Sequence, residues 1–166
     1  MQDKEYKKYW DCISKDETLT EDFIEKYQNE LNWKILSKYK KFSENFIEKY
    51  KKKIDWNYVA IYQKLSEKFI EKYEHELYRN DILIFQKLSE NYIEKYINKN
   101  INEVKWSILS RYQKLSENFI EKYQDKIDWI LISKYQKLSN KFIEKYQNKV
   151  YWNYILKYQN IFKNIK

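Results

Sequence analysis

The chain has 166 residues, of which 35% are charged, and its formal net charge at pH 7 is +8. Glycine and proline are absent, which excludes a glycine-rich phosphate-binding loop of the usual form. No segment approaches the ~18 continuous apolar residues of a membrane span, and the start has no apolar stretch of the secretory type. A single cysteine excludes an intramolecular disulfide, so we expect an intracellular protein.

A repeat of 23 residues runs through most of the chain. Its copies begin at Leu19, Phe42, Leu65, Leu88, Leu115 and Leu138. A short period of this kind is typical of proteins built from stacked small units. We therefore predict one repeat domain over 1–166, with a half-repeat cap at 1–18, six repeats at 19–160 and the end of a C-terminal capping helix at 161–166. One interval is longer, and its insertion at 97–103 is expected to lie in a loop.

Each repeat divides into two similar halves, and each half predicts a short helix. In the clearest copy, Ser116 and Asp128 are good N-cap residues, and an apolar residue precedes each of them. Apolar side chains then follow at spacings of three and four, as on one face of a helix. Helices this short rarely persist alone, so stacking must stabilise them. The predicted fold is all-α, an α-solenoid of about a dozen short antiparallel helices, two per repeat.

The second cap position is less regular than the first. Thr20 or a serine occupies every first cap, whereas the second caps are Asn32, Asp55, Tyr78, Lys105, Asp128 and Tyr151. Tyr78, Lys105 and Tyr151 are poor caps. The stretch 74–82 is the most aberrant, because Arg79 also replaces a tryptophan there. At the ends, helical spacing is expected around Trp10, and 151–166 is expected to form one longer helix.

Two aromatic columns accompany the helices. The six tryptophans share one repeat position, which suits contact between adjacent repeats, although an exposed aromatic ladder is the alternative. The other column ends the second helix of each repeat and contains Tyr39, Tyr62, Phe85, Tyr112, Tyr135 and Tyr158. For this column we expect core packing with the hydroxyl at the rim, and the alternative is a stacking surface for nucleic-acid bases.

The lysines form two columns with different surroundings. One column, from Lys26 to Lys145, has a glutamate before every lysine, so its charges are expected to be neutralised. The other has no such partner and forms a candidate basic stripe of Lys38, Lys41, Lys64, Lys87, Arg111, Lys114, Lys134, Lys137 and Lys157. A strongly AT-rich gene would also enrich lysine, so coding bias is an alternative origin of the positive charge.

No catalytic constellation is present in the sequence. His75 and Cys12 are the only histidine and cysteine and lie in different repeats, so neither a zinc cluster nor a Cys/His pair is indicated. We expect His75 in a solvated loop and Cys12 as a buried or half-buried side chain. No enzyme activity, cofactor or metal is predicted.

Two segments of the repeat resemble short tandem repeats found in proteins of giant DNA viruses and of some bacteriophages. These segments are LSENFIEKYQDKIDW and ISKYQK. The resemblance covers about residues 19–160 and implies a viral source and a helical repeat fold. It brings no established activity and no functional residues. Arg79, the insertion at 97–103 and the missing caps depart from the pattern.

Three functions fit these observations. The first is a non-enzymatic scaffold that binds a host protein or host-defence complex in the host cytoplasm, as an inhibitor of host defence, because solenoids present extended surfaces. Its candidate contacts are His75, Arg79, Asn98, Lys99, Asn100 and Asn102. The second is nucleic-acid binding through the basic stripe and its tyrosines. The third is a self-associating structural viral protein. The sequence leaves the oligomeric state open.

Overall fold

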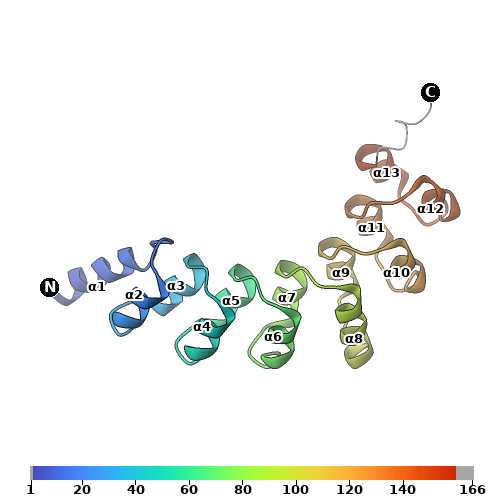
Figure 1. The fold of residues 1–166 in the computed structure, drawn as a ribbon. Coiled ribbons are helices and arrows are strands. Elements are labelled where there is room, and N and C mark those ends of the chain that lie inside the picture. The colour runs from blue at the N-terminus through green and yellow to red at the C-terminus, as the bar shows by residue number, and fades with distance from the viewer. Residues whose placement is uncertain (1, 160–166) are drawn as a thin grey trace. The chain divides into compact units, whose positions relative to one another are not determined.

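The computed structural model describes residues 2–159, which form thirteen α-helices and no strand (Figure 1). The helices are α1 Gln2–Ile13, α2 Glu21–Lys26, α3 Trp33–Tyr39, α4 Glu44–Lys49, α5 Trp56–Tyr62, α6 Glu67–Lys72, α7 Arg79–Phe85, α8 Glu90–Asn100, α9 Trp106–Tyr112, α10 Glu117–Lys122, α11 Trp129–Tyr135, α12 Asn140–Lys145 and α13 Trp152–Tyr158. The prediction of an all-α fold with two short helices per repeat is confirmed. None of the described helices combines the length and apolar character needed to cross a membrane.

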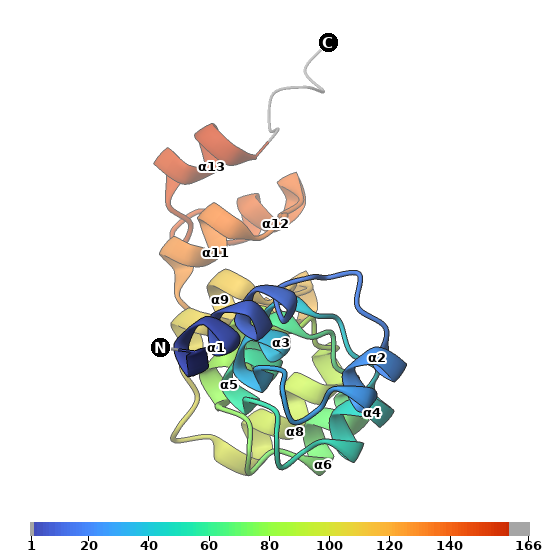
Figure 2. The same ribbon diagram turned by 90° about the vertical axis from the view of Figure 1, so that its left-hand side faces the viewer.

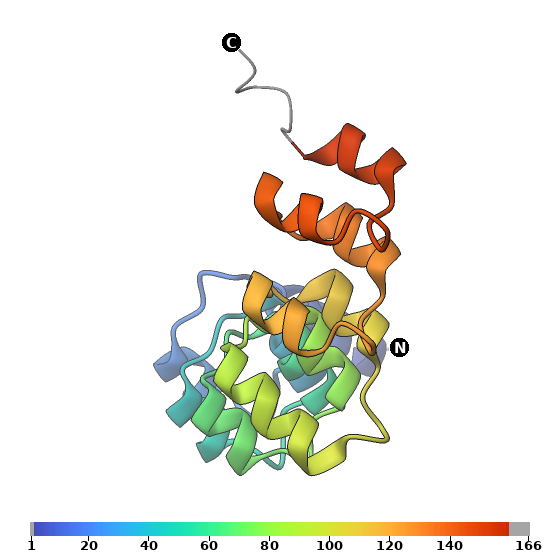
Figure 3. The same cartoon turned by 90° about the vertical axis from the view of Figure 1, so that its right-hand side faces the viewer.

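The helices gather into two compact units, Met1–Gln86 and Lys87–Lys166, called here the N-terminal and C-terminal units. In the N-terminal unit the second helices α3, α5 and α7 pack side by side, and the first helices α2, α4 and α6 form another layer (Figures 1 and 2). In the C-terminal unit α9, α11 and α13 pack side by side, with α8, α10 and α12 beside them (Figure 3). The prediction of one domain over 1–166 stays a prediction.

The caps follow the sequence pattern. Ser43 accepts a hydrogen bond from the backbone N–H of Phe46 at 3.2 Å, and Thr20 and the other first-cap serines make the same bond. Asn32, Asp55 and Asp128 cap the second helices in the same way. Tyr78, Lys105 and Tyr151 make no side-chain cap bond, as expected. A cap of this kind contributes about 1 kcal/mol to a helix, so most of the short helices begin at a defined residue.

A buried glutamine, which the sequence pattern did not single out, ties consecutive repeats together. The Gln63 side chain donates to the backbone carbonyls of Ser37 and Lys40 at 3.0 and 2.7 Å and accepts from the N–H of Phe42 at 2.9 Å. Gln86 and Gln136 make equivalent bonds, and so does Gln159, whose side chain is only half-buried. Gln63 is only 4% exposed, so these bonds satisfy backbone groups that water does not reach.

A buried serine in several second helices makes a further link between repeats. The Ser37 hydroxyl donates to the carbonyl of Trp33 at 2.7 Å and accepts from the N–H of Asp55, the next second-helix cap, at 3.0 Å. Ser14, Ser110 and Ser133 accept in the same way from the caps one repeat later. Ala60 occupies this position one repeat before Tyr78 and has no hydroxyl to offer. The aberrant stretch 74–82 therefore lacks both a side-chain cap and this link.

Two features differ from the expectations. The first four residues of the insertion, 97–100, are helical and lengthen α8, because Ile97 continues the apolar face of that helix and is buried. The predicted loop is therefore wrong for these residues. The last described helix, α13, ends at Tyr158 with Gln159 as its C-cap, because the Gln159 side chain turns back to bond the preceding repeat. The predicted longer helix is wrong at that point, and 160–166, including the predicted cap end at 161–166, lies outside the described residues.

The Gln136→Leu variant tests whether the buried glutamines stabilise the fold. Leucine keeps most of the volume but removes three hydrogen bonds from a buried site, and each buried polar group left without a partner costs about 1–3 kcal/mol. We expect the free energy of unfolding, measured by urea denaturation with circular dichroism, to fall by at least about 2 kcal/mol. Gln147→Leu, at an exposed turn, is the matched control and should change it by less than about 0.5 kcal/mol. Equal urea midpoints for the two variants would contradict this role.

Candidate functional site

The lysines of the first helices are neutralised by glutamates of the preceding repeat. The ammonium of Lys49 lies 2.6 Å from the carboxylate of Glu25, and Lys72 pairs with Glu48 at 2.5 Å. Lys122 and Lys145 pair in the same way with Glu94 and Glu121. We call this set the Glu–Lys ladder. It confirms the expected charge neutralisation and shows that each pair joins two repeats.

The pairing in the ladder shifts the pKa of its four lysines and of Glu48. The hydrogen bond from Lys72 lowers the pKa of Glu48 below 4.5, and the same bond raises the pKa of Lys72 above 10.5. Hydrogen bonds with Glu25, Glu94 and Glu121 likewise raise the pKa of Lys49, Lys122 and Lys145. Both partners are therefore ionised at neutral pH. Their net charge is close to zero, so this face attracts a charged partner only weakly.

The second helices of the C-terminal unit carry cations that contact tyrosine rings instead of carboxylates. The Arg111 guanidinium lies over the rings of Tyr112 and Tyr135, at 5.0 and 5.2 Å from their centroids. Lys134 lies over Tyr135 and Tyr154, at 5.1 and 5.4 Å. The row continues through the rings of Tyr154 and Tyr158, whose centroids are 6.1 Å apart, to Lys157 over Tyr158 at 5.4 Å.

The N-terminal unit has a shorter version of this arrangement, in which both cations belong to α3. The Lys38 ammonium lies over Tyr39 at 5.0 Å and over Tyr62 of the next repeat at 5.9 Å. Tyr62 contacts Tyr58 at 5.8 Å, and Lys34 lies over Tyr58 at 5.8 Å. We define a basic-aromatic row in each unit by itself. It consists of Lys34, Lys38, Tyr39, Tyr58 and Tyr62 in the N-terminal unit, and of Arg111, Tyr112, Lys134, Tyr135, Tyr154, Lys157 and Tyr158 in the C-terminal unit.

The expectation that this aromatic column packs in the core is wrong for five of its six residues, whereas Tyr39 is half-buried. Tyr112, Tyr135 and Tyr158 are 44%, 40% and 48% exposed, and Tyr62 and Phe85 are also exposed. In the repeats after the first, the buried residue at the end of the second helix is the glutamine that follows the tyrosine or phenylalanine, as at Gln63 and Gln136. The tyrosine consequently turns outward, where its ring is available to cations and to solvent.

The row keeps its positive charge. The second helices α9, α11 and α13 contain Arg111, Lys134 and Lys157 but no aspartate or glutamate. A tyrosine ring attracts a cation through its quadrupole without cancelling the charge. A side-chain hydrogen bond with Tyr39 raises the pKa of Lys38, and one with Tyr135 raises that of Lys134, so both stay protonated at neutral pH.

The remaining residues of the predicted basic stripe lie in the linkers that follow the second helices. Lys41, Lys64, Lys87, Lys114 and Lys137 are all exposed there. The Lys41 ammonium donates to the backbone carbonyl of Tyr62 at 2.6 Å, so it caps the end of α5. The predicted stripe therefore has two parts in each unit, a row in contact with aromatic rings and a set of linker lysines.

The predicted protein contacts lie in both units. In the N-terminal unit His75 is exposed beside Glu76, and Arg79 is exposed at the start of α7. In the C-terminal unit Asn98 and Lys99 are exposed on α8, and Asn102 is exposed just beyond it. Asn100 is half-buried and donates to the carbonyl of Tyr96 at 3.1 Å. That these residues contact a protein partner stays a prediction.

The tryptophans join adjacent repeats. The Trp33 ring lies 4.8 Å from the ring of Tyr50 in the next repeat, and its indole N–H donates to the carbonyl of Gln28 at 2.8 Å. Trp10, Trp56, Trp106 and Trp129 contact tyrosines one repeat later in the same way. These five tryptophans are half-buried structural contacts, as the repeat position predicted.

The two residues considered for catalysis are both exposed. His75 lies in a turn, as expected, whereas Cys12 is exposed and not half-buried, because α1 presents that side to solvent. Among the described residues no three histidine, cysteine, aspartate or glutamate side chains are grouped as metal ligands would be.

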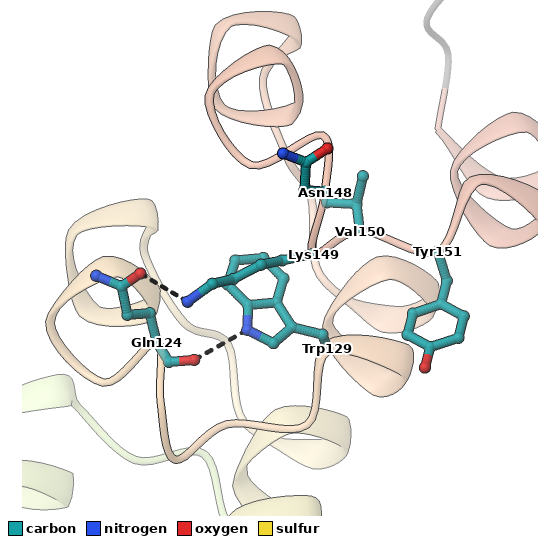
Figure 4. A pocket seen from close by; sticks show the side chains of 6 residues that line it. All are labelled: Gln124, Trp129, Asn148, Lys149, Val150 and Tyr151. Atoms are coloured by element: carbon teal, nitrogen blue, oxygen red, sulfur yellow. Dashed lines mark hydrogen bonds between the residues drawn. The ribbon is translucent and has the colours of Figure 1, made fainter.

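A hollow on the C-terminal unit is lined by Gln124, Trp129, Asn148, Lys149, Val150 and Tyr151 (Figure 4). Its polar groups bond one another, because Lys149 donates to the Gln124 side chain at 2.9 Å and the Trp129 indole donates to the Gln124 carbonyl at 2.9 Å. Lys53, Gln28 and Trp33 repeat this arrangement in the N-terminal unit. The hollow is thus part of the repeat structure.

Comparisons with protein-family models, with curated proteins and with solved structures found no match.

The Glu–Lys ladder predicts a pH dependence of stability at both extremes. Glu48 has a lowered pKa in the folded state, so its contribution is present above pH 4.5 and is lost as the pH falls through that lowered pKa. Lys72 has a raised pKa, so its contribution is present below pH 10.5 and is lost as the pH rises through the raised value. Melting temperatures measured across pH at low salt should therefore show a plateau between these limits.

In the Glu48→Gln variant, the melting temperature should fall less at acid pH than in the unmodified chain. The reason is that the variant has no carboxylate at this position to be protonated. Glu17→Gln removes an exposed carboxylate outside the ladder and is the control. If the melting temperature falls identically at acid pH in Glu48→Gln and in the unmodified chain, the ion pair does not contribute to stability. Because the pair is exposed, high salt should also reduce the effect.

Proposed function

We propose that this protein is a non-enzymatic repeat scaffold that binds an extended, phosphate-bearing polyanion through the basic-aromatic row. The observation that supports the proposal is the contrast between two sets of cations. Lys122 and Lys145 are paired with carboxylates, whereas Arg111 and Lys134 contact only rings and keep their charge. Uncompensated charge on a surface attracts and orients an oppositely charged polymer.

The row fits an extended ligand better than a compact one. Within the C-terminal unit it passes over three consecutive second helices, α9, α11 and α13, and each of them adds one cation. Neighbouring packed helices lie ~10 Å apart, so the three cations follow one another at intervals of about that length. A polymer with regularly spaced phosphates can contact all three, whereas a small anion would contact only one.

The two kinds of cation allow a charge-matched test. Arg111→Gln/Lys134→Gln removes two charges from the row, and Lys122→Gln/Lys145→Gln removes two from the Glu–Lys ladder of the same unit. Labelled inorganic polyphosphate is the probe, and fluorescence anisotropy over a salt series gives the affinity. We expect the row variant to bind polyphosphate at least about tenfold more weakly at low salt. The plot of log affinity against log salt concentration should also be less steep by about 2, because each lost phosphate contact reduces that slope by about 1.

The ladder variant should bind much as the unmodified chain does. If both variants lose affinity equally, the net charge and not the row governs binding, which would contradict the proposal. The proposal is also wrong if the unmodified chain shows no affinity for polyphosphate or for nucleic acid at low salt. Circular dichroism of every variant confirms that the helices remain folded.

A further inference from the structure

We infer that the polyanion bound by the basic-aromatic row is a single-stranded nucleic acid whose bases stack on the exposed tyrosine rings, an inference that rests on the function proposed above. Phosphate charge alone requires only cations. The row also contains rings, and in the C-terminal unit every cation contacts at least one of them. A ligand that uses both features must carry flat aromatic groups together with phosphates.

The exposure of the rings supports base stacking. Tyr112, Tyr135 and Tyr158 each leave 40% or more of their surface open to solvent. Base stacking on an aromatic side chain contributes ~1–3 kcal/mol per base, and it tolerates any base because every base has a flat face. The guanidinium of Arg111 contacts two of these rings and keeps its charge for the phosphates of the same strand.

The contacts between the rings and cations also hold the site in place before a ligand arrives. The Arg111 guanidinium contacts both Tyr112 and Tyr135, so the two ring centroids lie no more than about 10 Å apart. Bases in a stacked strand rise ~3.4 Å each, so these two rings match bases that are at most about three nucleotides apart. The intervening phosphates then pass close to the cation between the rings.

A single strand fits the row better than a duplex does. In a duplex the bases already stack on one another, and exposing one costs a few kcal/mol. In a flexible single strand the bases turn outward at little cost, as in proteins that bind single strands with aromatic side chains and a basic groove. The linker cations Lys114 and Lys137 follow α9 and α11 and extend the positive surface for the backbone.

The test uses the Tyr112→Leu/Tyr135→Leu variant, which removes two rings but no charge. The control is Tyr151→Leu, because Tyr151 is 48% exposed in the same unit and takes no part in the row. The probes are labelled oligodeoxythymidine, oligouridine, a DNA duplex, inorganic polyphosphate and polyglutamate, all measured by anisotropy in one buffer. Circular dichroism checks the fold of both variants.

We expect the unmodified chain to bind the single strands more tightly than the duplex, the polyphosphate or the polyglutamate. The double variant should lose at least about fivefold in affinity for the single strands, as expected for lost base stacking, and keep its affinity for polyphosphate. The control should bind every probe as the unmodified chain does. The stronger of the two single strands identifies DNA or RNA as the better ligand.

Four outcomes would overturn the inference. If the double variant keeps its affinity for single strands, the rings do not stack with bases, although the proposed polyanion function would stand. If the duplex binds as tightly as the single strands, the row recognises the phosphate charge alone and not the bases. If polyglutamate binds most tightly, the partner is an acidic protein segment. The absence of any binding to a phosphate polymer would contradict the proposed function as well.

Discussion

The whole structure depends on contacts between repeats, because its helices are too short to persist alone. Helices of six or seven residues lie well below the ~12 residues that an isolated helix needs in water. Each repeat is therefore held by its neighbours, through buried glutamines such as Gln63, through hydroxyls such as Ser37 and through tryptophan–tyrosine contacts. These bonds are directional as well as stabilising, so within each unit they set the positions of the second helices that they join and of the side chains on their outer surfaces.

The same stacking gives the charges two different surroundings. On the first helices, a lysine lies beside a glutamate of the preceding repeat and is neutralised, as in Lys145 with Glu121. On the second helices, a cation lies between tyrosine rings, as Arg111 does, and stays uncompensated. Within the C-terminal unit, the repeats thus carry one set of lysines that is paired with carboxylates and one set of cations that contacts only aromatic rings.

The sequence predicted the helices well because their causes are local. The serine caps, the spacing of apolar residues and the weak cap at Tyr78 each depend on only a few neighbouring residues, and the structure confirms them. The glutamines were missed because their partners lie 21 to 26 residues away in the chain. The exposure of Tyr135 was wrongly predicted for a related reason: the apolar period continues to the tyrosine, whereas the buried place beside it belongs to Gln136. The basic stripe was found in part: the lysine positions were correct, but the contacts with rings of the next repeat, such as Lys38 with Tyr62 and Arg111 with Tyr135, arise only when successive repeats pack.

The proposed function places the binding surface on the second helices, and photo-crosslinking locates such a surface directly. A single strand that carries halogenated uracil would be irradiated with the unmodified protein, and the crosslinked residues would be identified by mass spectrometry. Crosslinks are expected at Tyr112, Tyr135 or Tyr158, whose rings are exposed and each contact a cation. Crosslinks confined to the first helices, around Lys122 and Lys145, would contradict this expectation, because those lysines are paired with glutamates and have no part in the proposed surface.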